Sequence, residues 1–86
     1  MPIISTFFGI IVRMYFGDHP PPHFHAEYQG QRATFDFDGN LLSGQIRSNT
    51  AKRLLREWAV LHKDELMLNW KRIEEGQPIA KIEPLD

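Results

Sequence analysis

The chain contains no cysteine among its 86 residues. A secreted domain of this size usually depends on disulfide bonds, so their absence favours the reducing cytoplasm. The apolar N-terminal stretch lacks a basic segment and a small-residue cleavage site, and Arg13 ends it. It is too short for a membrane span and has no signal-peptide pattern. We therefore expect a cytoplasmic protein without a membrane partner.

A large excess of either charge is also lacking. Ten basic side chains stand against eleven acidic ones, which gives a net charge of −1. Because nucleic-acid-binding domains are usually basic, the charge balance does not predict such binding. The chain has no repeat and no linker, so we expect a single domain over residues 1–86. A domain this small must bury its aromatic residues efficiently.

Three of the four histidines lie in one short motif, His19-Pro20-Pro21-Pro22-His23-Phe24-His25. Prolines favour an extended, stiff segment, which would hold His19 at a nearly constant distance from His23. Imidazoles beside a carboxylate bind Zn²⁺ or Ni²⁺, and they also act as acids or bases near neutral pH. His19, His23 and His25 are therefore candidate metal ligands and candidate catalytic residues. The alternative is a structural role, with hydrogen bonds to Asp36 and the backbone.

The residues after the prolines alternate between apolar and polar, which predicts a hairpin of two strands. A two-residue turn at Gln29-Gly30 would set the register. Phe24 would then oppose Phe35 on the apolar face, and His23 would oppose Asp36 on the polar face. The polar face would carry His23, His25, Glu27, Arg32, Thr34 and Asp36. Asp36 is accordingly a candidate binding residue that orients a histidine.

Residues 10–16 are rich in β-branched and aromatic side chains and predict a further strand. Residues 3–8 predict a short strand or arm, and residues 41–46 predict a weaker strand. Arg13 is a candidate contact for an anionic ligand, or else an ion-pair partner within the sheet. Asp18 precedes the histidines and is a candidate binding residue. Its alternative role is to accept backbone hydrogen bonds in the turn.

The sequence period changes at residues 48–50, where a Ser, an Asn or a Thr can cap a helix. Residues 51–62 follow helical spacing, and Asp64 is a candidate cap for helical residues that continue to Ile73. Gly76 predicts the helix end. A basic patch accompanies the first helical stretch and is either a phosphate contact or a solvated helix face. The basic patch consists of Arg47, Lys52, Arg53 and Arg56.

These patterns predict an α+β fold. We expect a small antiparallel sheet of three to four strands, followed by one kinked helix or two consecutive helices packed on one face.

Several motifs are spread over nearly the whole chain. They are Tyr15-Phe16, Asp18-His19, Pro21-Pro22-His23-Phe24-His25, Glu57-Trp58, Leu61-His62-Lys63-Asp64-Glu65-Leu66, Asn69-Trp70 and Ile82-Glu83-Pro84-Leu85. Together they resemble a small bacterial family catalogued as domain of unknown function 4160, in which another residue often stands at the place of Pro20. The resemblance implies a stand-alone cytoplasmic protein encoded beside another small protein, a setting similar to toxin–antitoxin pairs. It carries over no catalytic residue.

Two functions follow as hypotheses. The favoured one is a binding or interaction module of a toxin–antitoxin-like pair, with a small protein partner and a nucleic-acid contact through the basic patch. The alternative is a small histidine-based or metal-dependent nuclease-like enzyme, in which His19, His23 and His25 hold zinc or nickel or transfer protons. Arg13 would then stabilise a phosphate. The sequence leaves open whether the chain is an enzyme, what it binds and its oligomeric state.

Overall fold

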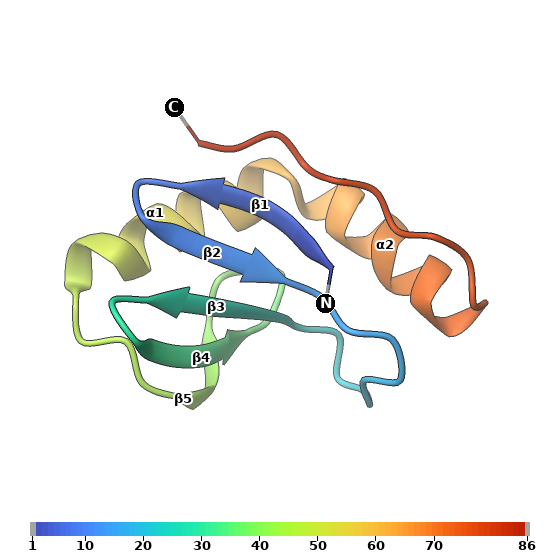
Figure 1. The fold of residues 1–86 in the computed structure, drawn as a ribbon, viewed down its shortest axis with the longest axis horizontal. Helices are drawn as coiled ribbons and strands as arrows, with labels where there is room; N and C mark the ends of the chain where they lie inside the picture. Colours follow the sequence, from blue (N-terminus) through green and yellow to red (C-terminus); the bar gives the residue numbers. More distant parts are fainter. Residues whose placement is uncertain (1, 86) are drawn as a thin grey trace.

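The structure, a computed structural model, describes residues 2–85. Its elements are β1 (Ile3–Phe7), β2 (Ile10–Arg13), β3 (Phe24–Tyr28), β4 (Gln31–Phe35), β5 (Leu41–Gly44), α1 (Asn49–Leu61) and α2 (Lys63–Glu74). The strands form one antiparallel sheet in chain order, and the two helices lie behind it in Figure 1. The α+β class and the two consecutive helices are as predicted. The sheet has five strands rather than three to four.

The additional strand arises from a turn that is hard to recognise in the sequence. Phe8 and Gly9 join β1 to β2, with φ angles of 50° and 79°. Positive φ at both positions gives the mirror-image turn that suits a two-residue hairpin. Phenylalanine rarely adopts positive φ. The sequence therefore predicts only a break at Gly9, whereas the chain forms a tight hairpin there.

The predicted hairpin between β3 and β4 is confirmed. Gln29 and Gly30 form its turn, with φ angles of 49° and 78°. Phe24 lies opposite Phe35, and the register between them and the turn is the predicted one. This agreement has a local cause, since turn length and the alternation of both strands act together on one short segment.

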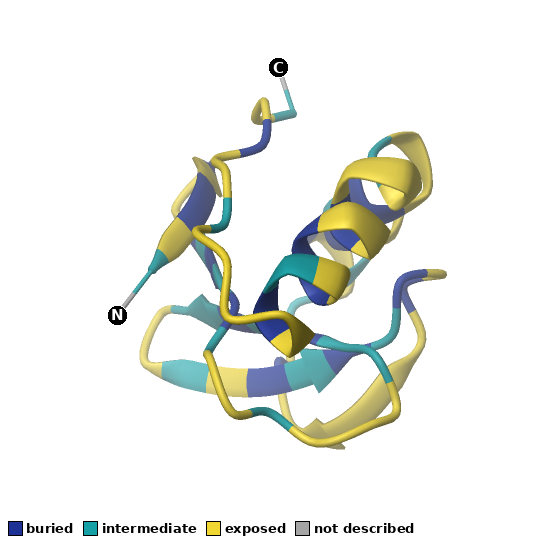
Figure 2. Ribbon diagram, turned by 90° about the vertical axis from the view of Figure 1, so that its right-hand side faces the viewer, coloured by how far each residue is buried: buried dark blue, intermediate teal, exposed yellow. Residues whose placement is uncertain are grey.

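An aromatic layer joins the inner face of the sheet to both helices. Phe24 stacks on Phe35 with ring centroids 5.7 Å apart, and Trp58 of α1 meets Phe24 edge-on at 5.5 Å. Trp70 of α2 meets Phe37 edge-on at 6.3 Å. Figure 2 shows the buried residues gathered between the sheet and the helices. Truncating a buried Phe or Trp to Ala costs about 3–5 kcal/mol, so this layer holds the helices on the sheet.

Local signals explain most of the helix ends. The Ser48 hydroxyl accepts the N–H of Ala51 at 3.0 Å, which caps α1 as predicted. His62 separates the helices, and α2 has no side-chain cap. The predicted cap, Asp64, instead lies in the first turn of α2. Gly76, with a φ of 69°, ends α2. Within the described residues, neither helix is long and apolar enough to cross a membrane.

The segment after α2 returns along β1. The buried side chain of Asn69 donates to the carbonyl oxygen of Ala80 at 2.8 Å and accepts its N–H at 3.0 Å. The N–H of Ile82 donates to a carbonyl oxygen of β1, and Nε1 of Trp58 donates to the carbonyl oxygen of Glu83. The segment thereby lies against the edge of β1 without forming a regular strand. The residues of β5, at the other edge, are all exposed.

Candidate functional site

The histidine motif lies in the loop between β2 and β3, at one end of the sheet. This loop differs from the extended segment that the sequence predicts. The Pro20–Pro21 peptide bond is cis, and the ring of His23 folds back so that Nδ1 lies 2.7 Å from the carbonyl oxygen of Pro21. The side chain of His19 is exposed. The loop therefore separates the three histidines that the sequence places together.

Asp18, His23 and His25 converge where this loop enters β3, and we call them the histidine cluster. Oδ2 of Asp18 lies 3.1 Å from Nε2 of His25 and 3.4 Å from Nε2 of His23. The side chains of Asp18, His23 and His25 are 20%, 14% and 31% exposed. Among residues 2–85, this is the group of histidine and acidic side chains whose potential ligand atoms converge, and it does not include His19.

Aromatic neighbours hold both imidazole rings of the histidine cluster. The ring of His25 meets Tyr15 edge-on, with centroids 4.5 Å apart. The ring of His23 lies between His25 and Trp70, at 5.1 Å and 5.4 Å. Contacts on both sides restrict the rotamers of the two histidines. The cluster is therefore preorganised by the core and by the strand end that follows the loop.

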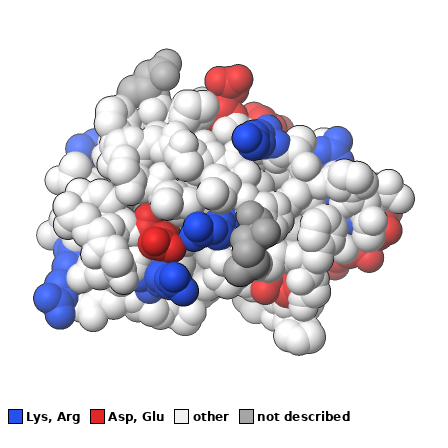
Figure 3. All heavy atoms as spheres, in the orientation of Figure 1, with Lys and Arg blue, Asp and Glu red and all other residues white. Residues whose placement is uncertain are grey.

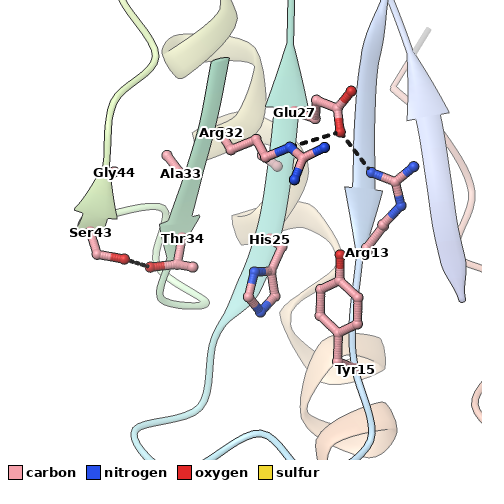
Figure 4. Close-up of a pocket in the computed structure, with 10 residues that line it drawn as sticks. Arg13, Tyr15, His25, Glu27, Arg32, Ala33, Thr34, Ser43 and Gly44 are labelled. Atoms are coloured by element: carbon pink, nitrogen blue, oxygen red, sulfur yellow. Dashed lines mark hydrogen bonds and ion pairs between the residues drawn. The ribbon is translucent and has the colours of Figure 1, made fainter. Parts of the chain in front are cut away.

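The outer face of the sheet, turned away from the helices, carries a pocket of about 430 Å³. We call it the outer-face pocket, and Figure 4 shows its side chains reaching in from neighbouring strands. Its polar lining consists of Arg13, Tyr15, His25, Glu27, Arg32, Thr34 and Ser43. The volume lies within the range of small-ligand pockets, about 300–1,000 Å³.

Two guanidinium groups share one carboxylate in this pocket. Oε1 of Glu27 lies 2.9 Å from Nη1 of Arg13 and 3.4 Å from Nε of Arg32. One negative charge between two positive charges leaves a positive excess, and each guanidinium keeps further N–H donors for a ligand. Figure 3 shows acidic and basic atoms side by side on this face. Arg13 therefore forms the predicted ion pair and also faces the pocket.

His25 belongs to both the histidine cluster and the outer-face pocket. It lies opposite Arg13 on β2 and opposite Thr34 on β4. The hydroxyl of Thr34 is 2.6 Å from that of Ser43 on β5. The sequence does not single out Ser43, because no local pattern shows that β5 pairs with β4 and places Ser43 opposite Thr34. The alternation of β4 and β5 would identify it only once their register is known.

Asp36 has a different role from the one predicted. Its carboxylate accepts the backbone N–H groups of Asp38 and Asn40, at 3.0 Å and 2.8 Å. Partial burial alone would raise the pKa of Asp36, but hydrogen bonds from Asn40, Asp38 and Gly39 lower it below its ordinary value of 3.8. The predicted pair with His23 does not form, since the turn between β4 and β5 engages the carboxylate and His23 contacts Asp18.

Three of the four residues in the basic patch line one hollow of about 410 Å³, which we call the basic groove. It lies between α1 and the turn that precedes β5, and its basic residues are Lys52, Arg53 and Arg56. Arg53 is paired with Glu57 at 3.0 Å. Arg47 does not line the groove, and its backbone N–H donates to the side chain of Gln31.

The chain matches one protein family over most of its length. No curated protein and no solved structure shows a significant match. Residues 9–71 match a family described as "Domain of unknown function (DUF4160)". The match extends from β2 into α2 and includes the histidine cluster, the outer-face pocket and the basic groove. Because it covers well over half of the sequence, the chain belongs to the family Domain of unknown function (DUF4160).

Proposed function

We propose that the protein is a binding module whose outer-face pocket holds a phosphate-bearing ligand, such as a nucleotide or a short stretch of single-stranded RNA. The observation that carries this proposal is the convergence of two guanidinium groups, three hydroxyl groups and one imidazole in a single pocket. Arginine suits phosphate because its planar donors match two phosphate oxygens at once. Hydroxyl groups supply neutral hydrogen bonds beside it.

A protein partner belongs to the same proposal. The exposed edge strand β5 places Leu41 beside the basic groove, and Leu42 is exposed next to it. An unpaired strand edge accepts another strand through backbone hydrogen bonds. A small partner that adds an acidic strand there would satisfy the edge and the charges of Lys52, Arg53 and Arg56. This is the arrangement proposed for a toxin–antitoxin-like pair.

A histidine-based nuclease-like enzyme is the second candidate, and one observation favours it. His25 is shared by the outer-face pocket and the histidine cluster. An imidazole at this position would face the phosphate of a bound ligand, while Asp18 and His23 stand behind it. General acid or base catalysis requires this kind of contact between a side chain and the reacting group.

One experiment separates these functions. The protein is mixed with a fluorescent single-stranded RNA, binding is followed by anisotropy at low and at physiological salt, and RNA length is read on a gel. We expect saturable, salt-sensitive binding. Arg13→Gln should weaken it by about tenfold or more, the loss expected when a charge-assisted hydrogen bond is removed.

Arg53→Gln is the matched control. Arg53 also pairs with a glutamate at 3.0 Å, but it lines the basic groove instead of the outer-face pocket. Equal losses in the two variants would contradict the assignment to the outer-face pocket. Shortened RNA products that disappear in His25→Ala would establish the nuclease-like candidate. Absence of binding at low salt would refute the proposed ligand class.

A further inference from the structure

The ligand atoms of the histidine cluster have the spacing of a metal site. Two ligands that each lie about 2.0–2.1 Å from a tetrahedral zinc ion stand about 3.3 Å apart. Oδ2 of Asp18 lies 3.1 Å and 3.4 Å from the Nε2 atoms of His25 and His23. All three potential ligand atoms lie within 4.8 Å of one another. An ion at their centre would need shifts of only a few tenths of an ångström at the two distances to Asp18.

The surroundings of His23 prepare its other ring nitrogen for a cation. A carbonyl oxygen only accepts hydrogen bonds, so Nδ1 of His23 carries the proton in its 2.7 Å contact with the carbonyl oxygen of Pro21. In the neutral ring, Nε2 then carries a lone pair, and Oδ2 of Asp18 lies 3.4 Å away. Two neighbouring acceptors repel each other unless a cation or a proton lies between them. Metal-binding histidines commonly donate their second N–H to a carbonyl in this way.

The burial of the cluster suits an ion with one open side. His23 is the most buried ligand and packs on Trp70, whereas His25 is 31% exposed and borders the outer-face pocket. Zinc sites that act on a ligand hold the ion with three protein groups and leave a position for water or the ligand. Two histidines with one carboxylate are also a known set for other divalent transition metals.

We infer that Asp18, His23 and His25 form a binding site for one divalent transition-metal ion, Zn²⁺ or Ni²⁺, with an open coordination position towards the outer-face pocket. The carboxylate of Asp18 replaces His19 in the three-histidine set that the sequence predicts. The site does not depend on the proposed phosphate ligand, because its ligands come from the chain alone.

The test is calorimetric titration of the 86-residue chain, without a polyhistidine tag, with zinc, nickel and magnesium chlorides. We expect one zinc or nickel ion per chain and no saturable binding of magnesium, which prefers oxygen ligands. Asp18→Asn, His23→Ala and His25→Ala should each weaken zinc binding by at least about tenfold. His19→Ala is the matched control from the same loop, and its affinity should stay within about twofold of the unchanged chain.

A second measurement on the unchanged chain guards against variants that do not fold. Zinc should shift the ¹⁵N signals of Nε2 in His23 and His25 and leave those of His19 and His62 in place. Equal losses in His19→Ala and His25→Ala would restore the three-histidine set and overturn the inference. So would shifts centred on His62, which lies beside Glu65, or a titration without saturation.

Discussion

Two aspartates from different loops, Asp18 between β2 and β3 and Asp36 between β4 and β5, differ in what surrounds their carboxylates. Asp18 faces two imidazole nitrogens at one end of the sheet, whereas Asp36 accepts backbone N–H groups of its own turn. Both were candidate binding residues on sequence grounds, because a carboxylate near histidines suits either role. Backbone donors satisfy Asp36 within its turn, so Asp18, and not Asp36, presents a carboxylate oxygen to His23 and His25.

Asp36 makes stability depend on pH in a defined direction. Its pKa in the folded chain is below the ordinary value of 3.8, so its carboxylate stabilises the fold above pH 3.8 and this contribution is lost as the pH falls through the lowered pKa. We expect Asp36→Ala to reduce the free energy of unfolding by about 1 kcal/mol at neutral pH. The difference from the unchanged chain should shrink in acid, as measured by urea denaturation with tryptophan fluorescence.

Asp36→Asn is the control for charge. It keeps an oxygen that can accept the N–H groups of the turn but cannot titrate, so its stability relative to Asp36→Ala should not vary with pH through this group. If the difference in unfolding free energy between the unchanged chain and Asp36→Ala stayed constant from neutral pH to acid, it would contradict the role assigned to Asp36.

At the scale of elements, the turn between β4 and β5 is pressed against α1. Gly39 is buried with a φ of 86°, and a Cβ atom there would lie 2.7 Å from Cα of Arg56. Lys63 at the start of α2 donates to the carboxylate of Asp38 in the same turn at 2.7 Å. This ion pair raises the pKa of Lys63 through its hydrogen bond with Asp38. The turn thus joins the sheet to the junction of the two helices.

Gly39→Ala and Gly17→Ala together measure this contact. Both glycines have nearly the same φ, 86° and 84°, so an alanine meets similar backbone strain, about 1–2 kcal/mol, at each. A Cβ at Gly17 meets nothing within 4 Å. We expect Gly39→Ala to cost clearly more in unfolding free energy, because α1 must move. Equal costs in thermal or urea denaturation would show that the turn yields without disturbing α1.

The hairpin turns show how far local sequence predicts an element. Gln29-Gly30 and Phe8-Gly9 adopt the same mirror-image turn with positive φ at both residues. Only the first was predicted as a hairpin, because clear alternation flanks it on both sides. Phe8 has an unfavourable side chain for positive φ, and its turn depends on the pairing of β1 with β2. The pairing of β1 with β2 forms only within the folded sheet, so the sequence around Phe8 does not reveal it.

At the scale of the whole molecule, the helices and the outer-face pocket lie on different sides of the sheet. The inner face holds the aromatic layer, where Figure 2 shows buried residues, and the outer face holds the outer-face pocket (Figure 4). His25 connects this pocket to the histidine cluster at the sheet end. A metal ion in the cluster would add positive charge at the rim of the pocket, where a phosphate is proposed to bind.

Zinc and RNA are therefore expected to strengthen each other's binding, by about five- to tenfold, which lies in the usual range of coupling between sites. The measurement is RNA anisotropy with and without zinc, and zinc titration with and without RNA. Linkage requires both affinities to change by the same factor. Asp18→Asn should abolish the zinc effect and retain the zinc-free RNA affinity. An RNA affinity that is indifferent to saturating zinc would separate the two sites.

The sequence by itself determined the features that depend on neighbours along the chain. These are the α+β class, the register of β3 with β4, a helix cap within residues 48–50, the helix end at Gly76 and the presence of a histidine motif. The tertiary structure alone decided that Asp18, rather than His19, lies beside His23 and His25, that residues 3–7 form an edge strand and not an arm, and that Arg13 and Ser43 share a pocket. Those outcomes depend on how a loop folds back and which strands lie side by side. Both are settled by packing between residues distant in sequence, which no local pattern encodes.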